Sequence, residues 1–269
     1  MIMRVAFLGF GTIGRIIFSE LVTRRPPGLD ITGCLDPALS AEARRELERG
    51  GVRIFADLDE LMKDRPDLVV EAASQRAAKE SVPRLLTEGI DVLSMSVGAY
   101  LDPDVMAEIR GQSRGKLFLS SGALPGVDVL KAAAVRGITS AELTTRKHPK
   151  SLAGAPGLAS VDCDLETLRE ARPVFSGSAQ EAVRLFPANV NIPATLSLAG
   201  IGPERTRVTI IADPGVRMNI HTVSLRGEFG TFTATIECLP SSNPKTSLVA
   251  ALSAVALLEG MVSPLRIGT

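Results

Sequence analysis

Hydrophobic residues in the first 120 positions alternate between short apolar runs and stretches in which apolar residues recur at helical spacing. A parallel sheet whose strands are joined by crossover helices requires this alternation. The apolar runs predict strands at 3–8, 29–35, 52–55, 67–72, 91–95 and 116–120. The amphipathic stretches predict helices at 13–24, 40–50, 58–63, 75–88 and 102–114. The first part of the chain is therefore expected to form an α/β domain with a parallel sheet.

The pattern changes after the turn-forming stretch Ser-Gly-Ala-Leu-Pro-Gly at 121–126. A predicted helix at 127–136 is followed by a predicted strand at 141–147 and a loop rich in Gly, Pro and Ser at 151–160. Two segments of alternating polar and apolar residues come later, at 207–212 and 218–238. Alternation of polar and apolar residues is typical of an antiparallel sheet with one solvated face. We therefore expect a second, smaller α/β domain with a largely antiparallel sheet.

The last apolar segment, at 246–261, has apolar residues nearly all round a helix. A helix of this composition must be buried. We expect it to return to the first domain and pack there. Its most apolar part, at 248–258, is too short to span a bilayer.

The first predicted strand runs directly into Gly-x-Gly-x-x-Gly, formed by Gly9, Gly11 and Gly14, and a predicted amphipathic helix follows. Strand, tight turn and helix in this order are what a dinucleotide-binding motif requires. The first glycine permits the turn, the second lets the backbone approach a pyrophosphate, and the third lets the helix pack closely on the strand. The open amides and the positive end of the helix then face the phosphates.

Two further features support cofactor binding by the first domain. Asp36 lies 22 positions after Gly14, at the end of the second predicted strand, where a carboxylate accepts hydrogen bonds from the adenosine ribose. Small residues at 72–74 either leave room for a cofactor or form only a tight turn into the next helix. We predict a Rossmann-type domain that binds NAD or NADP. The residues expected at the cofactor are Gly9, Gly11, Thr12, Ile13, Gly14, Asp36 and Ala73.

The composition excludes several other classes of protein. Of the 269 residues 45% are hydrophobic and 22% charged, as in an ordinary globular enzyme. Its 30 basic and 30 acidic residues leave no net charge, so nothing indicates a nucleic acid or a membrane as partner. The three cysteines, Cys34, Cys163 and Cys238, are scattered and without metal-ligand spacing. We expect buried thiols, no metal site, no signal peptide and a reducing, cytoplasmic location.

The chain has two histidines, and His221 lies in a strand pattern with apolar neighbours. It is either a structural histidine or a general acid and base, since imidazole titrates near neutral pH. Asp213 and Asn219 are candidates to orient it, although Asp213 before Pro214 also suits a turn. His148 lies in a basic loop that is either a solvated charge cluster or an anion-binding patch.

The start of the last helix holds further candidates. Asn243 suits an N-cap and Pro244 suits the first helical position. Lys245 and Thr246 have no such structural reason, and their charge and hydroxyl at a helix N-terminus suit an anion or a nicotinamide carboxamide. Asn189, at the start of another predicted helix, is either a cap or faces the cofactor with its amide.

Taken together, these motifs resemble the L-aspartate dehydrogenase family, in order and over nearly the whole chain. The matching segments lie at 9–14, 120–123, 189–191, 197–200, 213–221 and 243–247. The resemblance implies a Rossmann domain, a smaller α/β substrate domain, a returning C-terminal helix and homodimers that use NAD or NADP. It also implies that His221 is catalytic and that Ala123 and Asn189 contact the cofactor. His148 departs from the pattern, because proline is expected there, which leaves the substrate role of that loop open.

The resemblance implies oxidation of L-aspartate to iminoaspartate, with hydride transfer from Cα to the nicotinamide and His221 as the base. The imine then hydrolyses to oxaloacetate and ammonia, or feeds pyridine-nucleotide biosynthesis. The residues expected at the substrate are Lys147, Asn219, Lys245 and Thr246. The implied dinucleotide-binding domain spans 1–121. The domain for the substrate, catalysis and dimerisation spans 122–241, and the returning helix spans 242–269.

Two other functions fit the same sequence. A Rossmann oxidoreductase of the dihydrodipicolinate reductase or homoserine dehydrogenase type also joins this domain to a sheet-rich one. A non-catalytic NAD-binding sensor would bind the cofactor without turnover. The choice of cofactor also stays open, because Asp36 should repel a 2′-phosphate and favour NAD, whereas Arg44 and Arg45 lie nearby in the sequence.

Overall fold

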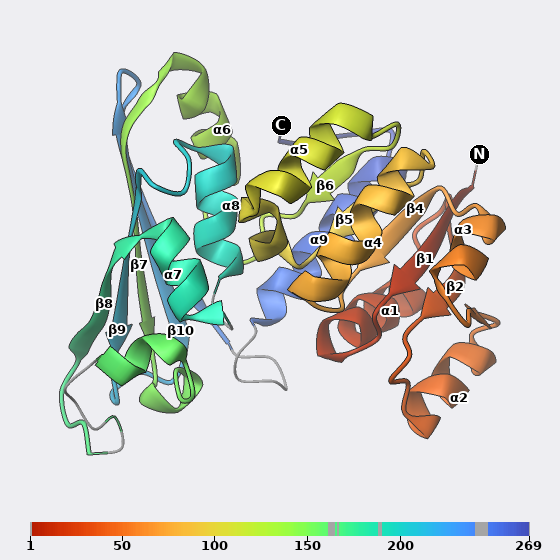
Figure 1. Cartoon of the computed structure of the whole chain (residues 1–269), viewed down its shortest axis with the longest axis horizontal. Helices are drawn as coiled ribbons and strands as arrows, with labels where there is room; N and C mark the ends of the chain where they lie inside the picture. The colour runs from red at the N-terminus through yellow and green to blue at the C-terminus, as the bar shows by residue number, and fades with distance from the viewer. Residues whose placement is uncertain (1, 161–164, 166, 188–189, 240–246, 269) are drawn as a thin grey trace. The chain divides into compact units, whose positions relative to one another are not determined.

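The computed structural model describes residues 2–160, 165, 167–187, 190–239 and 247–268. The chain forms two compact units, drawn in Figure 1. The first unit contains residues 1–120 and 251–266, and the second contains residues 121–250 and 267–269.

The first unit is built on a six-stranded parallel sheet with the order β3-β2-β1-β4-β5-β6. Its strands are β1 Met3–Leu8, β2 Leu29–Leu35, β3 Arg53–Ile54, β4 Leu68–Glu71, β5 Asp91–Ser94 and β6 Leu117–Leu119. The helices between them are α1 Thr12–Arg24, α2 Ala41–Arg49, α3 Leu58–Asp64, α4 Gln75–Thr87 and α5 Pro103–Gln112, with a short 3-10 helix, η1, at Val97–Leu101. This strand order defines a Rossmann sheet, whose direction of winding reverses between β1 and β4.

Burial on both faces explains why the central strands are nearly continuous apolar runs. Val5, Ala6 and Phe7 of β1 are fully buried, as parallel strands covered by helices on both sides must be. The ring of Phe18 on α1 lies edge-on to Phe7 and to Phe10, with ring centroids 6.2 and 5.3 Å apart. These contacts fix the first helix on the sheet directly behind the glycine turn.

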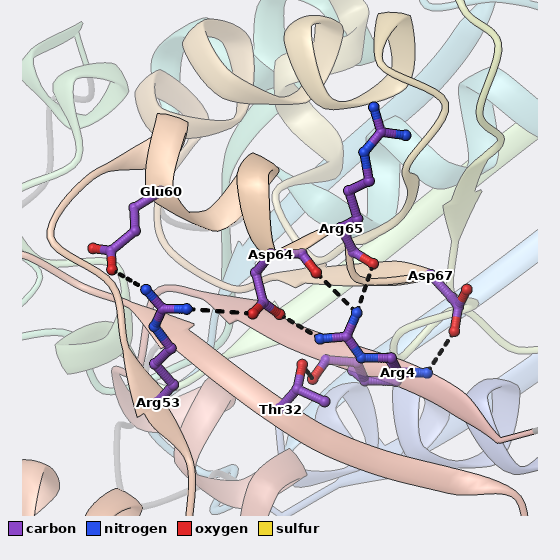
Figure 2. Close-up of polar contacts among 8 residues, drawn as sticks. Arg4, Thr32, Arg53, Glu60, Asp64, Arg65 and Asp67 are labelled. Atoms are coloured by element: carbon purple, nitrogen blue, oxygen red, sulfur yellow. Dashed lines mark hydrogen bonds and ion pairs between the residues drawn. The ribbon is translucent and has the colours of Figure 1, made fainter.

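An ion-pair network ties β1, β3 and α3 together (Figure 2). The guanidinium of Arg4 donates to the backbone carbonyls of Asp64 and Arg65, at 2.8 and 3.0 Å, and to the carboxylate of Asp64 at 2.7 Å. Arg53 on β3 also reaches Asp64, at 3.5 Å, and pairs with Glu60. A cation at the C-terminal end of α3 satisfies carbonyls that have no intrahelical partner.

The second unit is built on a five-stranded sheet with the order β11-β10-β7-β9-β8. Its strands are β7 Ile138–Lys147, β8 Arg172–Ser178, β9 Thr206–Ala212, β10 Asn219–Gly227 and β11 Gly230–Cys238. Three of the four neighbouring pairs are antiparallel, and only β7 and β9 run parallel. The helical segments are α6 Val127–Arg136, α7 Ala179–Leu185 and α8 Asn191–Ala199, with short 3-10 helices η2 Pro149–Ser151 and η3 Pro156–Ser160.

The three helices α6, α7 and α8 cover one face of this sheet (Figure 1). The core between them includes Leu130, Leu143, Phe186, Leu196 and Val223. The opposite face is polar, and its cross-strand pairs include Thr222 with Thr235, whose hydroxyls lie 2.9 Å apart. The predicted sheet with one solvated face is therefore confirmed.

The predicted elements of the first 120 residues are all present, with ends that shift by at most two positions. The predicted fold class, a Rossmann-type sheet with a second, largely antiparallel sheet, is confirmed. The sequence interpretation missed the short helices η1, η2 and η3 as well as β8 and α7.

The last helix, α9 Leu248–Val262, is buried along one stripe only. Ala251, Val255 and Leu258 belong to that stripe, whereas Leu252 is 37% exposed. The apolar composition predicted a buried helix, and within the described residues the full burial is limited to this stripe. Glu259 of α9 pairs with Arg24 of α1 within the first unit. Within the described residues, we find no helix with the length and apolar character needed to cross a membrane.

Candidate active site

The glycine turn between β1 and α1 has space for a ligand on one side only. Gly9 has a φ of +92°, and a Cβ there would lie 2.6 to 2.7 Å from atoms of Ala73. A Cβ on Gly14 would lie 2.6 Å from the carbonyl oxygen of Gly9. A Cβ on Gly11, in contrast, would meet no described atom within 4 Å. The first and third glycines are thus required by packing, and the second leaves its surface open.

This open surface suits the pyrophosphate of a dinucleotide. Gly11 is the N-cap of α1 and has no side chain to occupy the amides of the first turn. Thr12 and Ile13 begin that turn, where helix geometry leaves the amides without intrahelical partners. Backbone donors and the positive end of the helix dipole favour a phosphate there.

Asp36 lies beside the same turn, just beyond β2. Its carboxylate accepts hydrogen bonds from the backbone amides of Phe10, at 2.7 Å, and Ala38, at 2.8 Å. The amide of Gly9 donates to the carbonyl of Leu35 at 2.8 Å. The structure therefore brings together all the residues of the first unit that were expected at the cofactor, namely Gly9, Gly11, Thr12, Ile13, Gly14, Asp36 and Ala73.

In the second unit, His221 lies on β10 opposite Thr145 of β7. Nδ1 of His221 and Oγ1 of Thr145 are 3.1 Å apart. His221 is only 2% exposed, so its ring is held between neighbouring strands. The strand pattern predicted at this position is confirmed.

Lys147, Asn219 and Cys238 lie on the same face of the sheet as His221. Lys147 follows Thr145 by two positions on β7, and Asn219 precedes His221 by two positions on β10. Because side chains alternate between the faces of a strand, residues two positions apart share a face. Asn219 is paired in register with Cys238 of β11. These side chains are buried, which places a cation, an imidazole, an amide and a thiol together at one end of the sheet.

Burial sets the protonation of the two basic groups. Burial, and then the positive charge of Lys147, lower the pKa of His221 to about 3. Burial also lowers the pKa of Lys147 to about 8, against a smaller opposite effect of Cys238. His221 is therefore a neutral imidazole at physiological pH.

Asp213 has other partners than His221. Its carboxylate pairs with Arg146 at 2.8 Å and accepts a hydrogen bond from the amide of Gly215 at 2.8 Å. The interpretation of Asp213 as a turn residue is therefore confirmed, and Thr145 takes the place beside His221 that we had considered for Asp213. His148 accepts a hydrogen bond from the amide of Lys150 at 3.3 Å and so caps η2.

Ala123 lies in the turn that precedes α6 and is 3% exposed. Three other expected site residues, Asn189, Lys245 and Thr246, lie outside the described residues, as do the expected capping residues Asn243 and Pro244.

Two features of these regions were missed from the sequence. Thr145 had no local signal, because it is a threonine on a strand 76 positions from its partner. Glu71, at the end of β4, is fully buried and hydrogen-bonded to Ser94 and Ser96. A single acidic residue inside an apolar run is a signal that could have identified it.

Family models match both halves of the chain. A model described as the NAD-binding domain of homoserine dehydrogenase matches residues 9–116, and a model described as the C-terminal part of aspartate dehydrogenase matches residues 128–261. A curated L-aspartate dehydrogenase from Methanocella arvoryzae is 40% identical over 271 residues, covering 99% of each chain. The chain belongs to the L-aspartate dehydrogenase family. Another L-aspartate dehydrogenase, from Methanosarcina barkeri, is 46% identical over 216 residues, covering 79% of each chain.

Solved structures agree with this family assignment. The crystal structure of aspartate dehydrogenase from Thermotoga maritima covers the whole of both chains, with a TM-score of 0.77 and 27% sequence identity. A hyperthermophilic archaeal homoserine dehydrogenase in complex with NADPH matches 99% of this chain and 100% of its own, with a TM-score of 0.60. Its sequence identity is only 14%, so this likeness shows a shared fold alone. Of the two family models, the one described as aspartate dehydrogenase matches the second half of the chain.

Proposed function

We propose that this chain is an NAD(P)-dependent L-aspartate dehydrogenase that oxidises L-aspartate to iminoaspartate. The observation that carries the proposal is the buried pair His221 and Thr145, beside Lys147 and Asn219, in the part of the chain that matches the aspartate dehydrogenase model. The glycine turn of the first unit supplies a cofactor site whose open surface fits a pyrophosphate.

The cofactor, when bound, supplies the hydride acceptor at C4 of its nicotinamide ring. The substrate ammonium must lose a proton before a hydride can leave Cα, because the nitrogen lone pair forms the new C=N bond. His221 accepts that proton. In the tautomer in which Nδ1–H donates to Oγ1 of Thr145, the imidazole keeps a lone pair on Nε2 for this purpose.

Iminoaspartate then adds water at its C=N bond and breaks down to oxaloacetate and ammonia. After the proton taken from the ammonium has passed to solvent, the neutral His221 takes a proton from the attacking water and returns it to the departing nitrogen. When iminoaspartate is released before it hydrolyses, it serves as a precursor for pyridine-nucleotide biosynthesis.

The substrate has two carboxylates, which need cationic or amide partners. We assign Lys147 and Asn219 to them, because both are buried on the face of the sheet that holds His221. Lys245 and Thr246 are assigned as further substrate contacts, and Ala123 and Asn189 as cofactor contacts, on the family resemblance. We also propose that the enzyme is a cytoplasmic homodimer, and the buried free thiols of Cys34 and Cys238 suit a reducing compartment.

The proposal is tested by following absorbance at 340 nm with L-aspartate and either NAD or NADP at alkaline pH, and with oxaloacetate, ammonia and the reduced cofactor in the reverse direction. His221→Asn should lower kcat by at least about 100-fold and leave cofactor affinity unchanged. Thr222→Val is a matched control, because Thr222 lies next to His221 on the opposite face of β10.

Turnover of homoserine but not aspartate would instead support the homoserine dehydrogenase alternative. Cofactor binding without turnover of aspartate in either direction would support the sensor. Full activity of His221→Asn would remove His221 from the mechanism.

A further inference from the structure

A buried carboxylate lies at the carboxyl edge of the Rossmann sheet, in a place that the proposed mechanism does not use. Glu71 is the last residue of β4 and has no exposed surface. It is paired in register with Leu8 of β1 on one side and with Ser94 of β5 on the other. The winding of the sheet reverses between β1 and β4, and ligands of such sheets bind outside the carboxyl ends of the strands at this point.

The hydrogen bonds of Glu71 fill all the acceptor positions of a carboxylate. One oxygen accepts from the amide of Ala73, at 2.9 Å, and the hydroxyl of Ser96, at 2.8 Å. The other accepts from the amide of Ser96, at 3.1 Å, and from the hydroxyl of Ser94. Four donors directed at two oxygens stabilise the ionised form. They act against burial, which is the larger effect and raises the pKa of Glu71.

The same carboxylate is connected to the glycine turn. The carboxylate of Glu71 accepts a hydrogen bond from the amide of Ala73. Gly9 packs against Ala73 so closely that a Cβ on Gly9 would have no room. Glu71 therefore fixes the loop after β4, which forms one wall of the turn, and holds a negative charge directly behind that wall.

We propose that the Glu71 carboxylate is a fixed negative charge that favours the oxidised form of the nicotinamide cofactor over the reduced form. The inference rests on the proposed position of the cofactor at the glycine turn. The oxidised nicotinamide ring is a cation and the reduced ring is neutral, whereas the rest of the dinucleotide is identical in the two forms. A buried charge is weakly screened by salt or water, so it acts on the ring more strongly than a surface carboxylate does.

The position of Glu71 is suited to this task. The strands β4 to β6 form the second half of the Rossmann sheet, and in such sheets each half binds one mononucleotide. Asp36, beside the turn after β2, belongs to the adenosine half. Glu71 belongs to the half that receives the nicotinamide, so its charge acts on the ring and distinguishes the two oxidation states.

The test compares the dissociation constants of the oxidised and the reduced cofactor in the unmodified chain and in Glu71→Gln. The chain has no tryptophan, so the reduced cofactor is titrated by its own fluorescence and the oxidised cofactor by calorimetry. We expect the ratio Kd(oxidised)/Kd(reduced) to rise about tenfold in Glu71→Gln, because only the cation loses an attractive charge. A merely structural role of Glu71 would weaken both forms equally and leave the ratio unchanged, and that result would overturn the inference.

Two further variants make the test independent of the folding of Glu71→Gln. Glu71→Met also removes the charge, with an apolar side chain of similar length, and should raise the same ratio. The double variant Ser94→Ala with Ser96→Ala keeps the carboxyl group but removes two of the donors that stabilise its ionised form. Its ratio should rise less than in Glu71→Gln and return toward that of the unmodified chain at higher pH, where the carboxyl group ionises. A ratio in this double variant that stays raised at high pH would contradict the inference.

Failure of the inference is distinguishable from failure of the proposed function. If the unmodified chain binds neither form of the cofactor, the proposed function is wrong. If it binds both forms and the ratio is the same in the Glu71 variants, only the role of the Glu71 charge is wrong.

Discussion

Oγ1 of Thr145 lies 3.1 Å from Nδ1 of His221, across two neighbouring antiparallel strands. Both side chains are buried, so the hydroxyl fixes the plane of the imidazole without competition from water. A histidine that accepts a proton at one ring nitrogen needs a partner at the other, because that partner determines which tautomer is present. In the proposed mechanism Thr145 is that partner, and it acts on the substrate only through His221.

Replacing Thr145 by valine should lower kcat for aspartate oxidation by about tenfold to 100-fold, because the imidazole loses the group that sets its orientation and tautomer. Cofactor affinity should not change. Steady-state rates and a titration with the reduced cofactor measure the two quantities on the same preparation.

Thr144→Val is the matched control, since Thr144 faces the opposite side of β7 and is paired in register with Thr222. Its kcat should stay within about twofold of the unmodified chain. Equal rates for Thr145→Val and Thr144→Val would show that the hydroxyl of Thr145 has no part in the reaction.

The parallel sheet could be predicted because each strand and helix leaves a local pattern, and connection rules leave few possible orders. The glycine turn could also be predicted, since strand, turn and helix are contiguous from residue 3 to 24. In contrast, β8 and α7 were missed. β8 contains a proline and a glycine and only two apolar side chains, Val174 and Phe175, so its short sequence has no clear alternation.

The site was predictable where one residue carries its own signal. His221 was proposed because it is a histidine among alternating apolar residues, and Lys147 because the substrate carboxylates need cationic partners. Thr145 was not, because only the register between β7 and β10 brings it to His221. Asp213 was assigned a second possible role for the opposite reason: it is near His221 in the sequence but pairs with Arg146 in the structure.

Replacing Lys147 by methionine should abolish turnover and yet stabilise the protein by roughly 2 kcal/mol at pH 7. Lys147 is 4% exposed, and its pKa is lowered to about 8, so folding below that pH requires burial of a charge. Between pH 8 and the ordinary lysine pKa of 10.5, the folded chain has lost this proton and the unfolded chain has not. The free energy of unfolding of the unmodified chain therefore rises with pH through this range. That of the variant does not, so the difference between the two chains becomes smaller.

Chemical denaturation at pH 7 and at pH 10 measures this difference. Lys150→Met is the control, because Lys150 is exposed in η2, and its effect should be small and the same at both pH values. A stabilisation by Lys147→Met that does not decrease between pH 7 and pH 10 would contradict the assignment of a buried, charged lysine.

Replacing Arg4 by methionine should destabilise the first unit by about 1 kcal/mol. The estimate is modest because the side chain of Arg4 is 40% exposed, so solvent screens its ion pair with Asp64. The larger loss is that of the two hydrogen bonds to carbonyls at the end of α3 (Figure 2). The free energy of unfolding, measured with denaturant, tests this value.

The exposed pair of Arg84 and Asp59, with atoms 2.6 Å apart, provides the comparison. Arg84→Met should change stability less than Arg4→Met, because this pair involves no helix-end carbonyl. Cofactor affinity should be the same in both variants. If Arg84→Met is as destabilising as Arg4→Met, the carbonyl contacts of Arg4 contribute nothing beyond a surface ion pair.

Gly9→Ala should affect mainly stability and Gly11→Ala mainly cofactor binding, although the two glycines are only two positions apart. At Gly9 the backbone has a φ of +92° and a Cβ would collide with Ala73, so Gly9→Ala should lower the free energy of unfolding by several kcal/mol, roughly 2 to 4. At Gly11 a Cβ meets no described atom within 4 Å, so Gly11→Ala should fold with a loss of about 1 kcal/mol or less. It should nevertheless weaken binding of the reduced cofactor at least about tenfold, because the methyl group occupies the surface that the pyrophosphate approaches. Thermal unfolding and a fluorescence titration separate the two effects, and binding of the cofactor to Gly11→Ala with unchanged affinity would place the pyrophosphate away from this turn.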